Sequence, residues 1–168
     1  MPLNLDRFQP GMPVISGAVL LGAAPGGQLT GAAASTLNNI QAEVHTYAQD
    51  QVTKIATASG LNAKVWNPEV DTEQKFKALI FDASGITCSD DLVQVYHFFH
   101  PVMRKLAECS RIIVLGRTPE SCDTPRQATA QRALEGFIRS LGKEVKKGGA
   151  AQLVYAAPGA EDQLESSL

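Results

Sequence analysis

The stretch SGAVLLGAAPGGQ, residues 16–28, decides the fold class of this 168-residue chain. Its first seven residues form a short apolar run, and a turn rich in alanine, proline and glycine follows directly. A short run without polar interruption is typical of a strand that is buried on both faces, as in a parallel sheet. Residues 16–22 therefore predict a first strand, and residues 23–28 predict a tight turn at its carboxyl end.

Four further apolar runs of similar length follow, and they predict strands at residues 63–66, 76–82, 111–116 and 151–156. Apolar residues at helical spacing separate these runs and predict helices at residues 29–59, 90–108 and 124–147. Pro101 is expected to kink the second helix or to delay its start. The third begins with Thr124 as N-cap and Pro125 at its first position.

Alternating strands and helices predict an α/β fold, a three-layer sandwich around a five-stranded parallel sheet. We expect the strand order 2-1-3-4-5, with strands numbered along the chain. In such sheets ligands bind at the carboxyl ends of the strands. The loops at residues 22–28, 82–90 and 116–124 are therefore the predicted location of function.

Residues 29–59 carry an apolar side chain at every third or fourth position until Gly60, a natural C-cap. One helix of this length would span roughly 45 Å, more than the strand it covers. Its overhang would leave an apolar stripe containing Val52 and Ile55 for a partner surface. We therefore expect a homodimer, or packing on a following domain. The alternative is a break near His45 that folds the segment back onto its own sheet.

Charge and apolar patterning exclude two classes of partner. Fifteen Lys and Arg against seventeen Asp and Glu give a net charge of −2, which provides no broad positive field for nucleic acid. No apolar run is long enough to cross a membrane, and the N-terminus lacks the pattern of a secretory signal. The three thiols, Cys88, Cys109 and Cys122, match no metal or redox spacing and fit a reducing cytoplasm.

Gly22, Gly26 and Gly27 form a glycine-rich turn between a predicted strand and a predicted helix. In this context backbone N–H groups can hold a phosphate. Gln28 stands where a dinucleotide-binding turn has its last glycine. Two interpretations stay open: a vestigial nucleotide-binding loop or a tight structural turn.

Other polar residues give weaker indications of chemistry. His97 and His100 lie one helical turn apart but lack a third ligand, so no metal site is predicted. Asp90 and Asp91 suit the start of a helix, where the dipole favours carboxylates. Cys122 has no histidine nearby in the sequence to activate it.

Three segments carry a family resemblance: FDASGIT at residues 81–87, HFFHPVMRKLAECSRIIVLG at 97–116, and the sequence from residue 130 onward that begins AQRALEGFIRSLGKEV. Together with a weaker match in VLLGAAPGG, they resemble the short-chain dehydrogenase/reductase family. The resemblance implies a degenerate Rossmann or flavodoxin-like fold. It also implies descent from oxidoreductases that use NAD(P)H.

The catalytic positions of that family are not retained. The resemblance places Gln127 where the family has its tyrosine and Gln131 where it has its lysine, and the serine position falls at or near Gly116 or Arg117. A glutamine does not act as an acid near neutral pH, so a ketone oxygen would have no proton donor. We therefore expect no catalytic residues in this chain.

The phrases FDASGIT, FFHPVMRKL and QRALEGFIRSLGKE are similar to the N-terminal domain of long-form 3-oxoacyl-[acyl-carrier-protein] reductases of the FabG type. This implies a non-catalytic domain that scaffolds or oligomerises a C-terminal reductase domain acting on acyl carrier protein or coenzyme A thioesters. NAD(P)H would then bind in that second domain. The alternative is a ligand-binding module that holds a nucleotide or part of the acyl substrate at the carboxyl ends of the strands.

This interpretation divides the chain into three segments. Residues 1–13, with three prolines, are expected to form an extended arm, and residues 14–160 the degenerate Rossmann domain. Residues 161–168 are expected to open a final helix or a linker to the reductase domain. The sequence given is thus expected to be part of a longer protein.

Overall fold

In the computed structural model, which describes residues 9–168, β1 (Ala18–Ala23) and β4 (Phe76–Asp82) form the centre of one parallel sheet. Every residue of β1 is buried. The strand order is β3-β2-β1-β4-β5-β6, where the remaining strands are β2 (Val44–Thr46), β3 (Lys64–Val65), β5 (Leu106–Arg117) and β6 (Ala150–Ala156). All neighbouring pairs are parallel. The expected α/β fold is confirmed.

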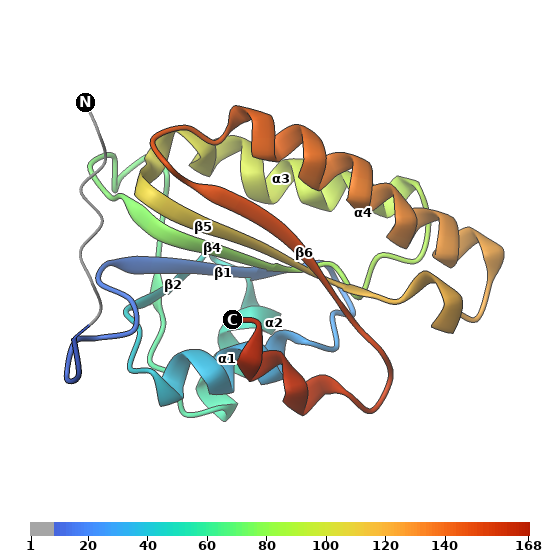
Figure 1. The fold of residues 1–168 in the computed structure, drawn as a ribbon, viewed down its shortest axis with the longest axis horizontal. Helices are drawn as coiled ribbons and strands as arrows, with labels where there is room; N and C mark the ends of the chain where they lie inside the picture. Colours follow the sequence, from blue (N-terminus) through green and yellow to red (C-terminus); the bar gives the residue numbers. More distant parts are fainter. Residues whose placement is uncertain (1–8) are drawn as a thin grey trace.

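Helices cover both faces of the sheet, as Figure 1 shows. On one face lie α1 (Thr30–Asn39), α2 (Asp50–Ala58) and the 3-10 helix η4 (Glu161–Ser166). On the other lie α3 (Val93–Val102), flanked by η1 (Asp90–Leu92) and η2 (Met103–Lys105), and α4 (Pro125–Glu144), preceded by η3 (Pro119–Ser121). Strand residues alternate between two cores, so Leu20 and Leu21 of β1 pack against opposite layers.

The single helix expected over residues 29–59 is wrong. The chain breaks after α1, where Gln41 adopts a left-handed φ of 54°, and a strand of three residues separates α1 from α2. Val44 pairs with Val19, so β2 supplies the hydrogen bonds that the open side of β1 needs. The sheet therefore has six strands and not five, and the alternative of a break near His45 was the better one. Gly60 ends the segment with a φ of 77°, as its predicted capping role requires.

Other boundaries also differ from the prediction: β1 begins at Ala18 rather than at residue 16, and α4 ends at Glu144 rather than at residue 147. The helix expected over residues 90–108 ends at Val102, and β5 already begins at Leu106 rather than at residue 111. The sequence pattern did not predict the first residues of β5, because this part of the strand is irregular. A register shift interrupts its pairing with β4, and Cys109 adopts a φ of 52° there. At α4 the prediction of the start is confirmed, since the Thr124 hydroxyl accepts a hydrogen bond from the backbone N–H of Gln127.

The two chain ends are only partly described. Residues 1–8 of the expected arm lie outside the described part of the chain. Near the other end, η4 packs against α1 and buries Leu164. Within residues 9–168, none of the helices combines the length and the apolar character that crossing a membrane requires.

The expected apolar stripe for a partner does not exist on α2. Val52 is 2% exposed and packs with Val44 against the sheet, so this side chain cannot form an intermolecular contact. Ile55 is half-buried on the same helix. The apolar spacing of residues 29–59 reflects packing on the chain's own sheet.

We predict that Val52→Asp destabilises the protein by about 3 kcal/mol or more, because it buries an unpaired charge. Val70→Asp is the matched control, since Val70 is 72% exposed, and its effect should lie within about 0.5 kcal/mol of zero. Urea unfolding of the two variants measures the difference. Equal midpoints would show that Val52 is not in the core.

Candidate functional site

The loops after β1, β4 and β5 meet at the carboxyl edge of the sheet, as expected for this fold. The backbone N–H of Gln28, in the first loop, donates to the Ser84 hydroxyl of the second at 2.8 Å. The Gln28 side chain accepts from the guanidinium of Arg117, at the end of β5, also at 2.8 Å. Hydrogen bonds within the protein thus join the three loops directly.

The carboxylate of Asp82 organises the centre of this edge. Asp82 ends β4, is fully buried, and accepts four hydrogen bonds. Its Oδ2 accepts from the backbone N–H of Leu29 at 2.8 Å and from the hydroxyl of Thr30 at 2.7 Å. Its Oδ1 accepts from the backbone N–H of Ser84 at 2.9 Å and from the Ser84 hydroxyl at 2.6 Å. A carboxylate of the chain itself therefore caps the positive end of α1.

The glycine-rich turn is packed against this carboxylate. A Cβ at Gly27 would lie 2.6 Å from Oδ2 of Asp82, and a Cβ at Gly85 would lie 2.6 Å from the backbone nitrogen of Gly27. Gly26 adopts a φ of 77° and Gly22 faces the ring of Phe98. Gly22, Gly27 and Gly85 must be glycine because a Cβ at these positions would collide with neighbouring atoms of the protein. Gly26 is favoured by its left-handed backbone conformation.

These residues do not fit the phosphates of a dinucleotide. Three successive N–H groups at the turn are already bonded: that of Gly27 to the carbonyl of Ala24, that of Gln28 to Ser84, and that of Leu29 to Asp82. A pyrophosphate would have to displace these bonds and approach the Asp82 carboxylate. In this structure the backbone donors of the turn are thus used within the protein itself.

Gln131, at the position where the resemblance has a lysine, is fully buried in α4. Its Oε1 accepts from the backbone N–H of Arg117 at 2.9 Å, and its Nε2 donates to the carbonyls of Ala83 and Ile86. A Cβ at Gly116 would lie 2.9 Å from the same Oε1, so no serine fits there without moving Gln131. Gln131 thus ties the ends of β4 and β5 to α4.

Gln127, at the tyrosine position of the resemblance, belongs to the start of α4. Its side chain accepts from the backbone N–H of Asp123 at 3.3 Å. Within residues 9–168, the side chains of Gln127 and Gln131 have no hydrogen-bond partner in common. The two glutamines have separate structural roles.

Tyr155 of β6 is a phenol near this end of the sheet that sequence reasoning missed. Its hydroxyl donates to the carbonyl of Gln131 at 3.0 Å or to the carboxylate of Glu135 at 3.3 Å. Burial, with a further contribution from Glu135, raises the pKa of Tyr155 to about 12. A proton held this firmly is a poor source for acid catalysis at neutral pH.

Arg117 closes the outer part of the edge and is only 8% exposed. Its Nη1 donates to Oε1 of Glu161 at 2.8 Å and to the carbonyl of Ala156 at 3.4 Å, while Nη2 donates to Gln28. The backbone N–H of Glu161, followed by the Arg117 guanidinium, lowers the pKa of the Glu161 carboxyl. Sequence reasoning had assigned no role to this ion pair.

The remaining sequence candidates lie apart from one another. His100 stacks on Tyr96 at the surface of α3, with ring centroids 4.8 Å apart. The Asp91 carboxylate accepts hydrogen bonds from Thr87 and Cys88 at the start of η1, and these lower its pKa. Burial raises the pKa of the Cys122 thiol. No group of three or more potential metal ligands occurs in the described part of the chain.

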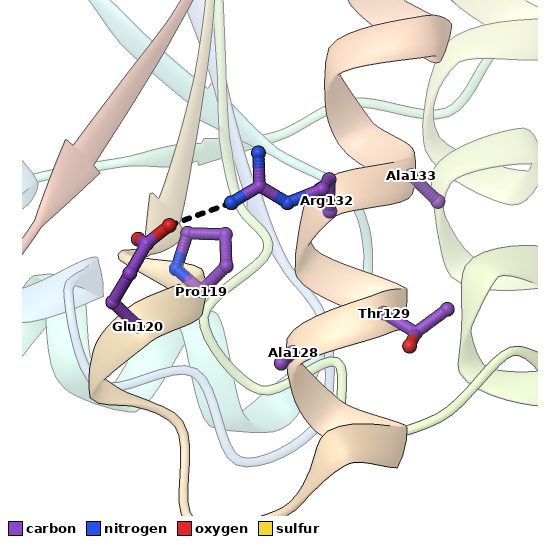
Figure 2. A pocket seen from close by; sticks show the side chains of 6 residues that line it. All are labelled: Pro119, Glu120, Ala128, Thr129, Arg132 and Ala133. Atoms are coloured by element: carbon purple, nitrogen blue, oxygen red, sulfur yellow. Dashed lines mark hydrogen bonds and ion pairs between the residues drawn. The ribbon is translucent and has the colours of Figure 1, made fainter.

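A pocket of about 480 Å³ lies beside the edge, between η3 and α4 (Figure 2). The Arg132 guanidinium donates to the Glu120 carboxylate at 2.6 Å across it, with Pro119, Ala128, Thr129 and Ala133 as the other lining residues. Arg132 and Glu120 are both more than half exposed. This pocket holds a solvated ion pair and no nucleophile paired with a base.

Solved structures match most of this chain. A short-chain dehydrogenase/reductase from Serratia marcescens is 16% identical with a TM-score of 0.62, over 86% of this chain and 75% of that one. BdcA from E. coli in complex with NADPH is 18% identical with a TM-score of 0.59, over 90% and 77%. A dehydrogenase/reductase from Sinorhizobium meliloti is 15% identical with a TM-score of 0.63, over 91% and 80%.

No protein-family model matches the sequence, and no curated protein matches it. At identities below a fifth, the likeness to solved structures establishes the fold. The chain therefore has the Rossmann-like α/β fold that these oxidoreductases share, and one of them holds NADPH.

We predict that Asp82→Ala destabilises the protein by about 3 kcal/mol or more, because it leaves the buried N–H groups of Leu29 and Ser84 without an acceptor. The control Asp90→Ala removes a carboxylate whose side chain is 86% exposed and should change stability by less than about 1 kcal/mol. Chemical denaturation of both variants tests this. A near-native midpoint for Asp82→Ala would contradict the capping role.

Proposed function

We propose that this chain is a non-catalytic Rossmann-like domain that scaffolds a 3-oxoacyl-thioester reductase domain following it in the same protein. The internal hydrogen bonding of Gly27, Gln28 and Leu29 carries this proposal, because it removes the phosphate-binding donors that a catalytic Rossmann domain needs. The resemblance to long-form reductases supplies the substrate class, thioesters of acyl carrier protein or coenzyme A. The three free thiols fit a reducing cytoplasm as its location.

Reduction of a 3-oxoacyl thioester moves a hydride to C3 and a proton to the carbonyl oxygen. NAD(P)H supplies the hydride when it is bound, and under this proposal it binds in the following reductase domain. The residues at this edge supply no proton, since Gln127 and Gln131 are amides and the Tyr155 proton is held by acceptors of the chain itself. Catalysis is thus assigned to the second domain.

Self-association is part of the proposed scaffolding role, and an apolar groove between α3 and α4 supports it. The groove has a volume of about 420 Å³, and Leu92, Val95, Phe99, Met103, Phe137 and Leu141 are among its lining residues. Tyr96 also lines it and is 57% exposed. Large exposed apolar side chains beside such a groove are typical of an interface.

A second copy of the chain is the proposed occupant of this groove. Asp90 and Asp91 precede α3, whereas Arg104 and Lys105 follow it. A two-fold axis perpendicular to α3 aligns two copies of this helix antiparallel, so each acidic start faces a basic end. The surface is therefore complementary to itself in charge as well as in apolar character.

Ligand binding at the carboxyl edge is the second candidate function. The observation that favours it is the buried guanidinium of Arg117, a residue type that recognises anions.

We predict that the purified chain consumes no NADPH in the presence of an acetoacetyl thioester, because it lacks an acid and free phosphate-binding donors. Absorbance at the nicotinamide band, against a buffer blank and an active short-chain reductase, measures this. Turnover that Gln127→Ala abolishes would contradict the proposal.

We predict that the chain is a dimer in solution and that Tyr96→Glu makes it a monomer, because the change puts a charge at the centre of an apolar contact. Light scattering over a range of concentrations measures the mass of both. Val70→Glu, at an exposed site away from the groove, should remain a dimer. A monomeric native protein at high concentration would reject the interface.

A further inference from the structure

The ion pair between Arg117 and Glu161 joins the sheet to the last segment of the chain. Arg117 belongs to β5, whereas Glu161 begins η4, which crosses to the opposite layer and packs on α1. The Glu161 side chain is 31% exposed and the Arg117 side chain 10%. The cation is therefore a fixed part of the edge, and its anion comes from a more exposed segment on the surface.

The segment that carries Glu161 rests on a polar cleft. This cleft of about 370 Å³ is lined by Gln28, Ser35 and Asn39 on the α1 side and by the carboxylates of η4, Glu161, Asp162 and Glu165, on the other. No residue of α1 is charged. Leu164 is the apolar anchor of the segment, since it is 3% exposed in the core beneath.

We propose that Arg117 forms an anion-binding site for a phosphate ester, and that the Glu161 carboxylate occupies this site as a built-in competitor. When η4 lifts from α1, its three carboxylates leave with it. The vacated cleft then offers one guanidinium at its end and uncharged amide and hydroxyl groups along its side. This site adjoins the glycine-rich turn through the Gln28 side chain but does not use the backbone N–H groups of Gln28 and Leu29, which stay bonded to Ser84 and Asp82.

The chemistry of the cleft favours a phosphate ester over other ligands. A guanidinium whose charge is largely shielded from water binds an oxyanion strongly, and phosphate offers it several acceptor oxygens. The hydroxyl and amide groups of Ser35 and Asn39 suit a polar, hydroxyl-bearing remainder of the ligand. An apolar chain would find few partners there.

The decisive variant is Glu161→Gln, which removes the competing charge and keeps the size of the side chain. We expect inorganic phosphate, titrated into the isotope-labelled chain at constant ionic strength, to bind this variant at least tenfold more tightly than the native protein. The nuclear magnetic resonance signals of Arg117, Gln28 and Ala156 should shift with one saturation curve. Adding Arg117→Met to the variant should abolish the binding.

Asp162→Asn is the matched control, because it removes the same charge from the same segment without a contact to Arg117. It should bind phosphate as weakly as the native protein. If Asp162→Asn gains as much affinity as Glu161→Gln, the effect is one of net charge and the proposal is wrong. Native binding as tight as that of Glu161→Gln would also overturn it, because Glu161 would then not compete.

Leu164→Ser provides a second route that leaves the ion pair chemically intact. It loosens the anchor of η4 and should raise phosphate affinity in the same way. A folded Glu161→Gln variant that binds no phosphate overturns the site. If Glu161→Gln does not fold, the Leu164→Ser titration decides, and no gain in phosphate affinity there rejects the proposal.

Discussion

The buried carboxylate of Asp82 is the interaction on which the carboxyl edge of this sheet depends. A fully buried charge is costly unless hydrogen-bond donors surround it, and here four donors from Leu29, Thr30 and Ser84 do so. The start of α1 supplies the N–H of Leu29, the hydroxyl of Thr30 and the positive end of a helix dipole. In dinucleotide-binding domains a ligand phosphate uses that position. In this chain β4 itself delivers the anion.

Gln131 and Arg117 form a second set of hydrogen bonds between buried polar groups at this edge of the sheet. Gln131 fills the space between α4 and the ends of β4 and β5, and its amide satisfies one N–H and two carbonyl groups. Beyond it, Arg117 is balanced by Glu161 from the end of the chain. The buried side chains of Gln131 and Arg117 thus find their hydrogen-bond partners within the protein, as buried polar groups generally do.

The sequence predicted those parts of the structure that are governed by local pattern. The strands at 76–82 and 151–156 are continuous apolar runs, and Thr124 with Pro125 is a local capping signal. The strand β2 was not predicted, because Val44–Thr46 continue the helical spacing of apolar residues on either side. Only their pairing with β1 makes them a strand. The role of Asp82 depends on contacts 52 and 53 residues away along the chain. The one local indication of this role in the sequence is that a charged residue, Asp82, ends an otherwise apolar strand.

The glycines show why a motif alone did not settle the site. Glycine is required wherever something approaches the backbone too closely for a Cβ, and that neighbour is either a ligand or the protein itself. At Gly27 the neighbour is the Asp82 carboxylate, and at Gly85 it is the backbone of the first loop. The sequence pattern is the same in both cases. What distinguishes a ligand-binding glycine turn from a structural one is the group that accepts hydrogen bonds from the adjacent N–H groups. Here the acceptors belong to Ala24, Ser84 and Asp82. In this structure the donors of the turn are therefore used to hold the start of α1 against the ends of β1 and β4.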